Sequence, residues 1–324
     1  KPLLQRDHGK PLPFEKPIFE LEAQLVKLES QPNPSATVKD SIRNMRVEIT
    51  KMKREVFMNL DPSDVVLVAR HQERPQVLDY IELLFDEFVE LRGDRAYRDD
   101  RAILTGFAKM DDEKILFVGQ QKGRNIQERT EHNYGMAHPE GYRKAQRLMD
   151  LADRFRLPVI TLVDTPGAYP GVGAEERGQA EAIARSIETC LDLHIPLISA
   201  IIGEGGSGGA IALAVANRVL MLEHATYSVI TPEGCAAILW RDLEHAQEAA
   251  DALKMTAQDL HQMAVVDEIV AEPIGGAHRS PEAAIIALGD ALEKALDELK
   301  PLNGAELRAK RREKFLEIGK IGLG

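Results

Sequence analysis

The architecture of this protein is indicated above all by one segment, Ile195-Pro-Leu-Ile-Ser-Ala-Ile-Ile-Gly-Glu-Gly-Gly-Ser-Gly-Gly-Ala-Ile-Ala-Leu-Ala-Val215. Its first part, residues 195–202, is an almost continuous apolar run, which is typical of a strand that is buried on both faces. Residues 203–210 form a glycine-rich loop, and residues 208–215 predict a short helix. A buried strand that leads through glycines into a helix predicts an α/β domain with a parallel sheet.

The same alternation of short apolar runs and helical patterns extends from residue 139 to residue 299. Further strands are predicted at 159–163, 218–222, 227–230 and 269–270, and further helices at 139–154, 174–193 and 281–299. Upstream, two apolar segments at 102–109 and 115–119 flank an acidic turn and predict a β-hairpin.

The first sixty residues are predicted to form a helical hairpin arm. Apolar residues at helical spacing precede a Pro-rich break at 31–34, and a heptad stripe follows it at Val38, Ile42, Met45, Ile49, Met52 and Val56. The stripe fits an arm that docks on another subunit and equally an arm that packs within the chain.

Two further segments complete the predicted organisation. Residues 61–91 contain two shorter helical patterns, of which the second runs from Val77 to Phe88. Residues 306–320 include the basic side chains of Arg308, Lys310, Arg311, Arg312 and Lys314, which favours a solvated helix face over an anion-binding tail. We therefore divide the chain into an arm at 1–60, an α/β domain at 61–300 and a basic helical tail at 301–324.

Composition limits the possible functions. Of 324 residues, 44 % are hydrophobic and 29 % are charged, which suits a chain that buries a sizeable core. The 52 acidic and 41 basic residues give a net charge of −11, whereas sequence-independent nucleic-acid binding needs a basic surface. Two cysteines, Cys190 and Cys235, cannot supply a four-ligand zinc site, although one disulfide between them stays possible. Residues 1–12 lack the apolar region of a secretory signal, and no apolar run has the ~20 residues that span a bilayer, so we expect a cytoplasmic protein.

Three glycine-containing loops follow predicted strands, and they are the candidate ligand site. They occupy residues 119–124, 164–173 and 203–210. Because loops at the carboxyl ends of parallel strands line the ligand crevice of an open α/β sheet, we expect all three to meet there.

The third loop allows several interpretations. It satisfies G-x-G-x-x-G, but it lies after an earlier sheet and not in a first βαβ unit, which argues against dinucleotide binding. It also matches the nucleophile pattern G-x-S-x-G around Ser207, for which Glu223, His224 and His278 would be partners by chain order only. The glycines could also serve close helix–strand packing alone.

A further interpretation uses the backbone. The first N–H groups of a helix have no partner within the helix, and the helix dipole favours negative charge beside them. A glycine pair at this position leaves the N–H groups open to a ligand and can form an oxyanion hole. We expect a side chain added at Gly209 to face the crevice.

Longer motifs make the chain recognisable. The stretches that carry the resemblance are Gly135-Met136, Pro139–Ala145, Asp164–Gln179, Ile202–Ala210, Ser228–Cys235 and Glu272–His278. Together they resemble the carboxyltransferase α subunit of bacterial and plastid acetyl-CoA carboxylase, in unbroken order from about residue 17 to residue 300.

This resemblance implies a fold, an activity and partners. The implied fold is crotonase-like (ClpP/crotonase), a spiral of ββα units with an N-terminal helical extension. The implied activity is transfer of the carboxyl group from carboxybiotin to acetyl-CoA, which gives malonyl-CoA for fatty-acid synthesis. The implied partners are a β subunit in an α2β2 assembly, the biotin carboxyl carrier protein and biotin carboxylase. Zinc is expected on the β subunit and no metal on this chain.

The resemblance also assigns site residues. Gly208 and Gly209 take the oxyanion position that stabilises the ureido oxygen of biotin. Gly205 and Gly206 shape the preceding turn, and the expected walls of the site are Gly167, Ala168, Tyr169, Gly171, Gly173, Lys122 and Arg124. Two alternatives stay open, namely the carboxyltransferase half of another biotin- or acyl-CoA-dependent enzyme, and a nonenzymatic assembly scaffold.

Overall fold

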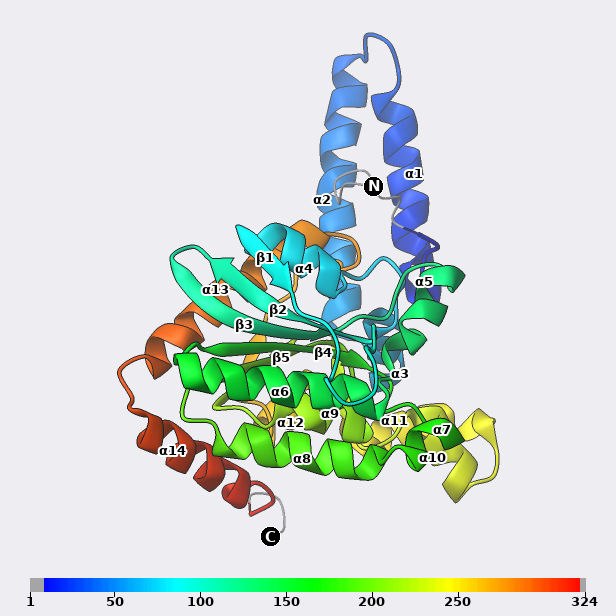
Figure 1. Ribbon diagram of the computed structural model, residues 1–324. Coiled ribbons are helices and arrows are strands. Elements are labelled where there is room, and N and C mark those ends of the chain that lie inside the picture. The colour runs from blue at the N-terminus through cyan, green and yellow to red at the C-terminus, as the bar shows by residue number, and fades with distance from the viewer. Residues whose placement is uncertain (1–8, 321–324) are drawn as a thin grey trace.

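An eight-stranded sheet runs through the body of the protein in the computed structural model, which describes residues 9–320 (Figure 1). Residues 1–8, the first of the predicted arm, and residues 321–324, the last of the predicted tail, lie outside the described residues. The strand order is β1-β2-β3-β4-β5-β6-β8, and β7 pairs with β5. The strands are β1 (Glu87–Glu90), β2 (Ile103–Met110), β3 (Glu113–Gln120), β4 (Val159–Thr165), β5 (Leu197–Gly206), β6 (Arg218–Leu222), β7 (Thr226–Ser228) and β8 (Glu268–Val270).

The first three strands are antiparallel, and every later pairing in the sheet is parallel. The predicted hairpin therefore forms as β2 and β3, and the predicted parallel strands follow it. One prediction is wrong: the helical pattern of residues 77–88 ends at Leu84, and residues 87–90 form the edge strand β1. Phe85 and Phe88 each contact the ring of Phe117 edge-on, so their apolar side chains are buried by the sheet and not by a helix face.

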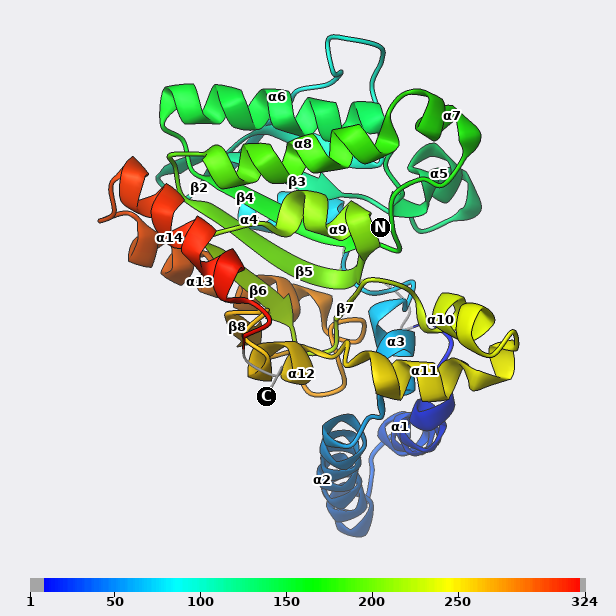
Figure 2. The same cartoon turned by 90° about the horizontal axis from the view of Figure 1, so that it is seen from below.

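Helices cover both faces of the sheet (Figure 2). On one face, α6 packs on β2 and β3, α9 packs on β4 and β5, and α8 packs on both helices. On the other face, α13 packs on α4 and reaches β5 and β8. These helices are α4 (Val77–Leu84), α6 (Pro139–Phe155), α8 (Gln179–Asp192), α9 (Ser207–Ala214) and α13 (Pro281–Leu299). The core lies between these layers, which explains why strands β4 and β5 are apolar on both faces.

Shorter helices fill the connections of the body. They are α3 (Pro62–Ala69), α5 (Ile126–Glu131), α7 (Val172–Glu176), α10 (Pro232–Leu239), α11 (Ala246–Leu253) and α12 (Ala257–Gln262), with 3-10 turns at Pro13–Glu15, Asn133–Gly135 and Leu243–His245. The sequence patterns did not predict the helices of residues 232–262.

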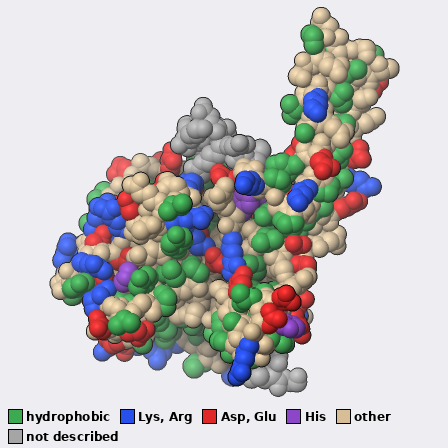
Figure 3. All heavy atoms as spheres, turned by 90° about the vertical axis from the view of Figure 1, so that its right-hand side faces the viewer, with side chains coloured by type: hydrophobic (Ala, Val, Ile, Leu, Met, Phe, Trp, Pro, Cys, Tyr) green, Lys and Arg blue, Asp and Glu red, His purple; other side chains and the backbone are tan. Residues whose placement is uncertain are grey.

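The arm consists of α1 (Lys16–Glu29) and α2 (Ala36–Met58), which project from the body side by side (Figures 1 and 3). Met45, Ile49, Met52 and Val56 of the heptad stripe belong to the small core that joins arm and body. The buried residues of this core are Ile18, Ile49, Phe57 and Val68. Within the described residues the stripe is thus used for packing inside the chain. Docking on another subunit stays a prediction.

The basic C-terminal segment forms α14 (Gly304–Glu317), which docks on the body through a buried arginine. The Arg311 guanidinium is fully buried and donates hydrogen bonds to the backbone oxygens of Cys190, Leu193 and Ile195 at 2.7–2.8 Å. Arg308 lies on the surface and pairs with Asp192 at 2.7 Å. The prediction of a solvated helix face therefore holds for Arg308 but not for Arg311. Arg311 donates hydrogen bonds to carbonyl groups near the end of α8 and just before β5.

Two smaller expectations can be compared with the structure. Cys190 and Cys235 are both free, so the possible disulfide is not formed. Among residues 9–320, no helix is long and apolar enough to cross a membrane. The cytoplasmic location stays a prediction.

Substitution of Arg311 tests whether its buried hydrogen bonds attach α14 to the body. Arg311→Met should lower the free energy of unfolding by about 3 kcal/mol or more, because several buried carbonyl groups lose a charged donor. Arg308→Met, which breaks an exposed ion pair on the same helix, should cost less than about 1 kcal/mol. Chemical denaturation of both variants measures the difference, and equal losses would contradict the assigned role.

Candidate functional site

The three glycine-containing segments meet at the carboxyl ends of β3, β4 and β5. Lys122 Nζ, which follows β3, lies 2.8 Å from Asp164 Oδ1 on β4 and 2.6 Å from Glu204 Oε2 on β5. A Cβ atom on Gly206 would lie 2.1 Å from the backbone oxygen of Pro166, so the second and third segments touch through their backbones. The expected crevice at this edge of the sheet is therefore present.

The junction between β5 and α9 differs from the predicted loop. Strand β5 continues to Gly206, because residues 204–206 pair with β7 and Gly205 also pairs with Thr165 of β4. Helix α9 begins at the next residue, Ser207, whose φ of 49° is a left-handed conformation that costs energy for a residue with a Cβ atom. This strained residue turns the chain directly from strand to helix.

The glycine pair at the start of α9 has two different environments. Gly208 is half-buried, and a Cβ atom there would contact the flexible end of Ile183 at 3.2 Å. Gly209 is buried, and a Cβ atom there would lie 2.6 Å from the backbone carbon of Gly167 and 2.8 Å from the nitrogen of Ala168. The expectation that a side chain at Gly209 faces the crevice is therefore wrong, because that side of Gly209 is filled by backbone.

An apolar cavity of about 390 Å³ opens beside this helix start. Ser207, Gly208 and Tyr227 contribute to its wall next to the junction. The rest of the lining is mainly aliphatic, from Ile211, Val229, Leu253, Leu260, Met263 and Val265. A cavity of this size with apolar walls and polar backbone at one end is typical of small-molecule sites.

A second, charged cavity of about 220 Å³ lies at the strand ends. It is lined by Lys122, Asp164 and Glu204 and by Arg70, whose Nε lies 2.6 Å from Glu204 Oε1. Arg70 also pairs with Glu233 at 2.6 Å, so its charge is shared between two carboxylates. The cationic groups of this cluster are occupied by carboxylates of the chain itself.

The cluster shifts the pKa values of its members. Burial alone would raise the pKa of Glu204, but Lys122 and Arg70 outweigh burial and lower that pKa to about 2. Burial likewise would lower the pKa of Lys122, and the carboxylates of Asp164 and Glu204 raise it instead. Both groups are therefore ionised at neutral pH, and Lys122 acts as a fixed cation between the strand ends.

The other residues expected at the site lie in several environments. Tyr169 stacks on His138 with ring centroids 4.1 Å apart, and Gly171 packs against the Tyr169 ring. Gly173 lies in α7, and Arg124 forms an ion pair with Asp79. None of these residues lines the apolar cavity beside Gly208, and Lys122 lines the charged cavity instead.

Some residues of the site region were not identified from the sequence. Arg70 and Glu233 are far apart in the chain, and although Glu233 lies in the Ser228–Cys235 motif, no sequence signal pointed to their ion pair. The aliphatic wall at residues 253–265 belongs to α11, α12 and the segment after them. The sequence patterns predicted neither of these two helices, so they gave no sign of this wall.

The serine-nucleophile interpretation lacks a base. His224 Nδ1 lies 3.2 Å from Glu272, and His278 Nε2 lies 3.0 Å from Glu15 at the joint between arm and body. Neither histidine lines the cavity that contains Ser207. Within residues 9–320, no group of three or more His, Cys, Asp or Glu side chains is placed to hold a metal ion.

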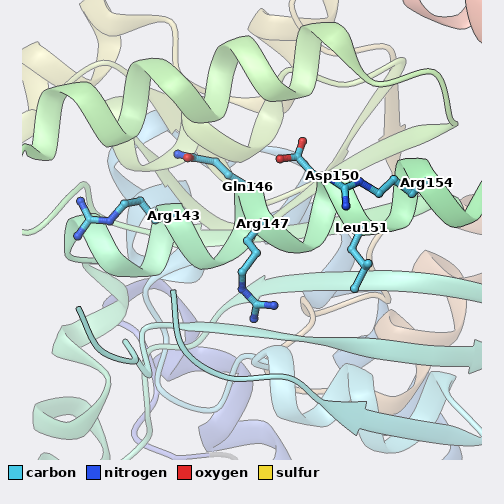
Figure 4. Close-up of a pocket in the computed structure, with 6 residues that line it drawn as sticks. All are labelled: Arg143, Gln146, Arg147, Asp150, Leu151 and Arg154. Atoms are coloured by element: carbon cyan, nitrogen blue, oxygen red, sulfur yellow. The ribbon is translucent and has the colours of Figure 1, made fainter. Parts of the chain in front are cut away.

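A further groove of about 400 Å³ runs along the outer face of α6 (Figure 4). Arg143, Arg147 and Arg154 line it, but they point in different directions, and Asp150 stands among them. Arg143 pairs with Asp94, and Arg147 donates to the backbone oxygen of Gly93. Because these side chains do not converge on a common point, the groove is a weaker candidate than the cavity beside Gly208.

Comparison with known proteins places this geometry in a family. A family model described as "Acetyl co-enzyme A carboxylase carboxyltransferase-like" matches residues 11–319. A Rhodospirillum centenum protein named acetyl-coenzyme A carboxylase carboxyl transferase subunit alpha is 56 % identical over 314 residues, which cover 97 % of this chain and 99 % of that protein. The protein of the same name from Agrobacterium fabrum is 51 % identical over 311 residues, 95 % of this chain and 98 % of that protein.

Solved structures share the fold at low identity. A transcarboxylase 12S structure with methylmalonyl-coenzyme A has a TM-score of 0.53 at 21 % identity and covers 67 % of this chain and 42 % of its own. A Pseudomonas malonate decarboxylase hetero-tetramer in complex with coenzyme A has a TM-score of 0.54 at 17 % identity, over 68 % of this chain and 90 % of its own. These neighbours have the crotonase fold, and the expected fold class is confirmed.

The charged cluster predicts that part of the free energy of unfolding is lost at acidic pH. Because folding lowers the pKa of Glu204 from 4.5 to about 2, its contribution of about 3 kcal/mol is present above pH 4.5 and is lost progressively as the pH falls towards 2. The stability advantage of the wild type over Glu204→Gln should therefore shrink by about 2 kcal/mol between pH 6 and pH 3 in urea titrations.

Glu233→Gln is the matched control for this titration. Glu233 pairs with the same Arg70, but its side chain is 46 % exposed against 12 % for Glu204, so solvent screens its pairing. Its advantage should shrink much less, and equal shrinkage for both variants would contradict the role given to the buried cluster.

Proposed function

The chain belongs to the family of acetyl-CoA carboxylase carboxyltransferase α subunits, and from this premise we propose how its site performs the carboxyl transfer. The protein is a carboxyltransferase subunit that acts in the carboxylation of acetyl-CoA, the step that gives malonyl-CoA for fatty-acid synthesis. The observation that carries the assignment of the site is the glycine pair at the start of α9, next to an apolar cavity at the strand ends.

The residues around this cavity fit a biotin group. Its walls offer aliphatic side chains to a largely apolar bicyclic ring, and Gly208 offers backbone N–H at the end of the cavity near the junction. Carboxybiotin, when bound there, supplies the carboxyl group that is transferred. The chain holds the ring by apolar contact and holds its ureido oxygen by backbone donors.

The N–H groups of Gly208 and Gly209 provide the electrostatic part of catalysis. They belong to the first turn of α9, where N–H groups have no partner within the helix and the helix dipole favours an anion. These N–H groups are held in position before the reaction, because Gly209 packs directly on the backbone of Gly167 and Ala168. One such donor contributes about 3 kcal/mol to a transition state that develops negative charge on oxygen.

This mechanism accounts for the lack of a protein base at the helix start. The residues at the helix start would hold the ureido oxygen of bound biotin through backbone N–H groups, and those donors would stabilise negative charge there. The strained Ser207 supports this role, since its conformation starts the helix immediately after the strand and brings the first N–H groups to the cavity.

The complete reaction requires partners, as the name "subunit alpha" of the relatives supports. We place acetyl-CoA mainly on a β subunit in an α2β2 assembly, with the zinc on that subunit. The biotin carboxyl carrier protein delivers the carboxylated group, and biotin carboxylase reloads it.

The chain alone, given carboxylated carrier and acetyl-CoA, should form no malonyl-CoA above background.

The family match decides against the two alternatives that the sequence left open, and two measurements check that decision. Preference for propionyl-CoA over acetyl-CoA in the assembled enzyme would indicate a different acyl-CoA carboxyltransferase. Full activity after loss of the glycine pair, with assembly retained, would indicate a scaffold whose chemistry lies elsewhere.

Gly208→Val tests the oxyanion assignment. A branched side chain at this half-buried position meets only the end of Ile183, so the variant should fold and assemble. It would obstruct the approach to the helix start, and malonyl-CoA formation should fall about 10²-fold or more. Gly209→Val is less informative, because its Cβ atom would collide with the Gly167–Ala168 backbone and disturb the fold.

Ser207→Ala is the matched control beside it. We expect it to keep at least about a third of the wild-type rate, because no histidine among residues 9–320 lines the cavity with the hydroxyl. Rates are compared after gel filtration has verified assembly with the β subunit. An assembled Gly208→Val enzyme with a rate close to wild type would mean that the oxyanion assignment is wrong.

A further inference from the structure

A glutamine side chain buried beneath the helix start makes two hydrogen bonds that the sequence did not suggest. Gln120 is the last residue of β3 and is 1 % exposed. Its Nε2 donates to the backbone oxygen of Gly209 at 2.7 Å, and its Oε1 accepts from the backbone N–H of Asp164 at 3.1 Å. One side chain therefore connects β3 with both β4 and the first turn of α9.

The backbone ladder between β4 and β5 is interrupted at this point. Val163 pairs with Ile201, but two residues further along β4 Thr165 pairs with Gly205, four residues further along β5. Such an irregularity leaves backbone groups outside the ladder and redirects the strand. Side chains take over here: Gln120 accepts from the Asp164 N–H, and the Asp164 carboxylate accepts from the Glu204 N–H at 2.9 Å.

We propose that Gln120 is a positioning residue for the oxyanion donors, because its amide fixes the first turn of α9 relative to the interrupted strand β4. This inference rests on the proposed function of Gly208 and Gly209. The carbonyl and the N–H of Gly209 belong to the same residue, so a bond at that oxygen limits rotation and sliding of the same helical turn. Gln120 does not line the apolar cavity and acts only through the backbone it holds.

The chemistry of the side chain matches this task. The two backbone groups are one acceptor, the Gly209 oxygen, and one donor, the Asp164 N–H, and an amide is the neutral side chain that satisfies both at once. A carboxylate at position 120 would lack the donor, and an aliphatic side chain would leave both backbone groups without this partner. Small displacements of preorganised donors cost large factors in rate, because the donors act at a defined oxygen position.

The adjacent residue provides a matched control. Gln121 is also 1 % exposed, and it bonds to the Gln76 side chain at 2.8 Å and accepts from the Leu78 N–H at 3.3 Å. It therefore attaches the start of α4 and does not touch α9. Gln120→Met and Gln121→Met remove the same chemistry at the same depth, but only the first releases the oxyanion helix.

The experiment compares both variants in the complex with the β subunit and the carboxylated carrier. Melting temperature and assembly should change similarly in the two variants, since each loses buried hydrogen bonds. The kcat of malonyl-CoA formation should fall about tenfold to a hundredfold for Gln120→Met and less than about threefold for Gln121→Met. The KM for acetyl-CoA should stay near the wild-type value in both.

A second variant covers the case in which Gln120→Met does not fold. Gln120→Glu keeps the length and the acceptor, and at mildly alkaline pH its ionised carboxylate has no N–H for the Gly209 oxygen, so kcat should fall in the same way. The proposal is overturned if kcat of the folded Gln120 variants stays within about threefold of wild type, or if Gln121→Met loses as much. Failure of the proposed function of Gly208 and Gly209 would show separately, as an assembled Gly208→Val enzyme with a rate close to wild type.

Discussion

The buried ion cluster at the ends of three strands is the constraint on which the site depends. Lys122 from β3 lies between Asp164 of β4 and Glu204 of β5, and all three side chains are largely removed from solvent. Charges buried in this way are expensive unless each has a partner, so the cluster tolerates little displacement of one strand end relative to another. The same place carries the interruption between β4 and β5, where backbone pairing alone could not hold the strands.

The position of helix α9 follows from that arrangement. Strand β5 ends at Gly206 against the backbone of Pro166, Ser207 turns the chain, and Gly209 packs on Gly167. Each contact is possible because a glycine brings backbone onto backbone without a Cβ atom between them. A site built from backbone N–H groups needs this closeness more than it needs titratable side chains, and this explains why the sequence shows no acid–base motif at the junction.

The arm and the C-terminal helix are attached by the same kind of interaction. Arg311 inserts a buried guanidinium among backbone oxygens of the body, and His278 joins Glu15 at 3.0 Å where the arm meets the body. Arg74 and Glu272 form a nearly fully buried ion pair, and Arg74 Nε also donates to the backbone oxygen of Ile202 at 2.7 Å. Arg74 thereby attaches its own segment to β5, the strand that leads into the oxyanion helix.

The amino-acid sequence by itself determined the α/β class, the arm, the strands that follow apolar runs and the convergence of the three glycine loops, because those features depend on local periodicity and on the rule that strand ends share an edge. Its motifs also identified the family. Only the tertiary structure decided that residues 87–90 form a strand, that a Cβ atom on Gly209 would meet backbone and not the crevice, and that Arg311 is buried. Only the tertiary structure brought Gln120 to Gly209. It also paired Arg70 with Glu204, which lies 134 residues further along the chain. Local patterns record which residues prefer burial, whereas the pairing of buried polar groups depends on distances between segments that no local pattern encodes.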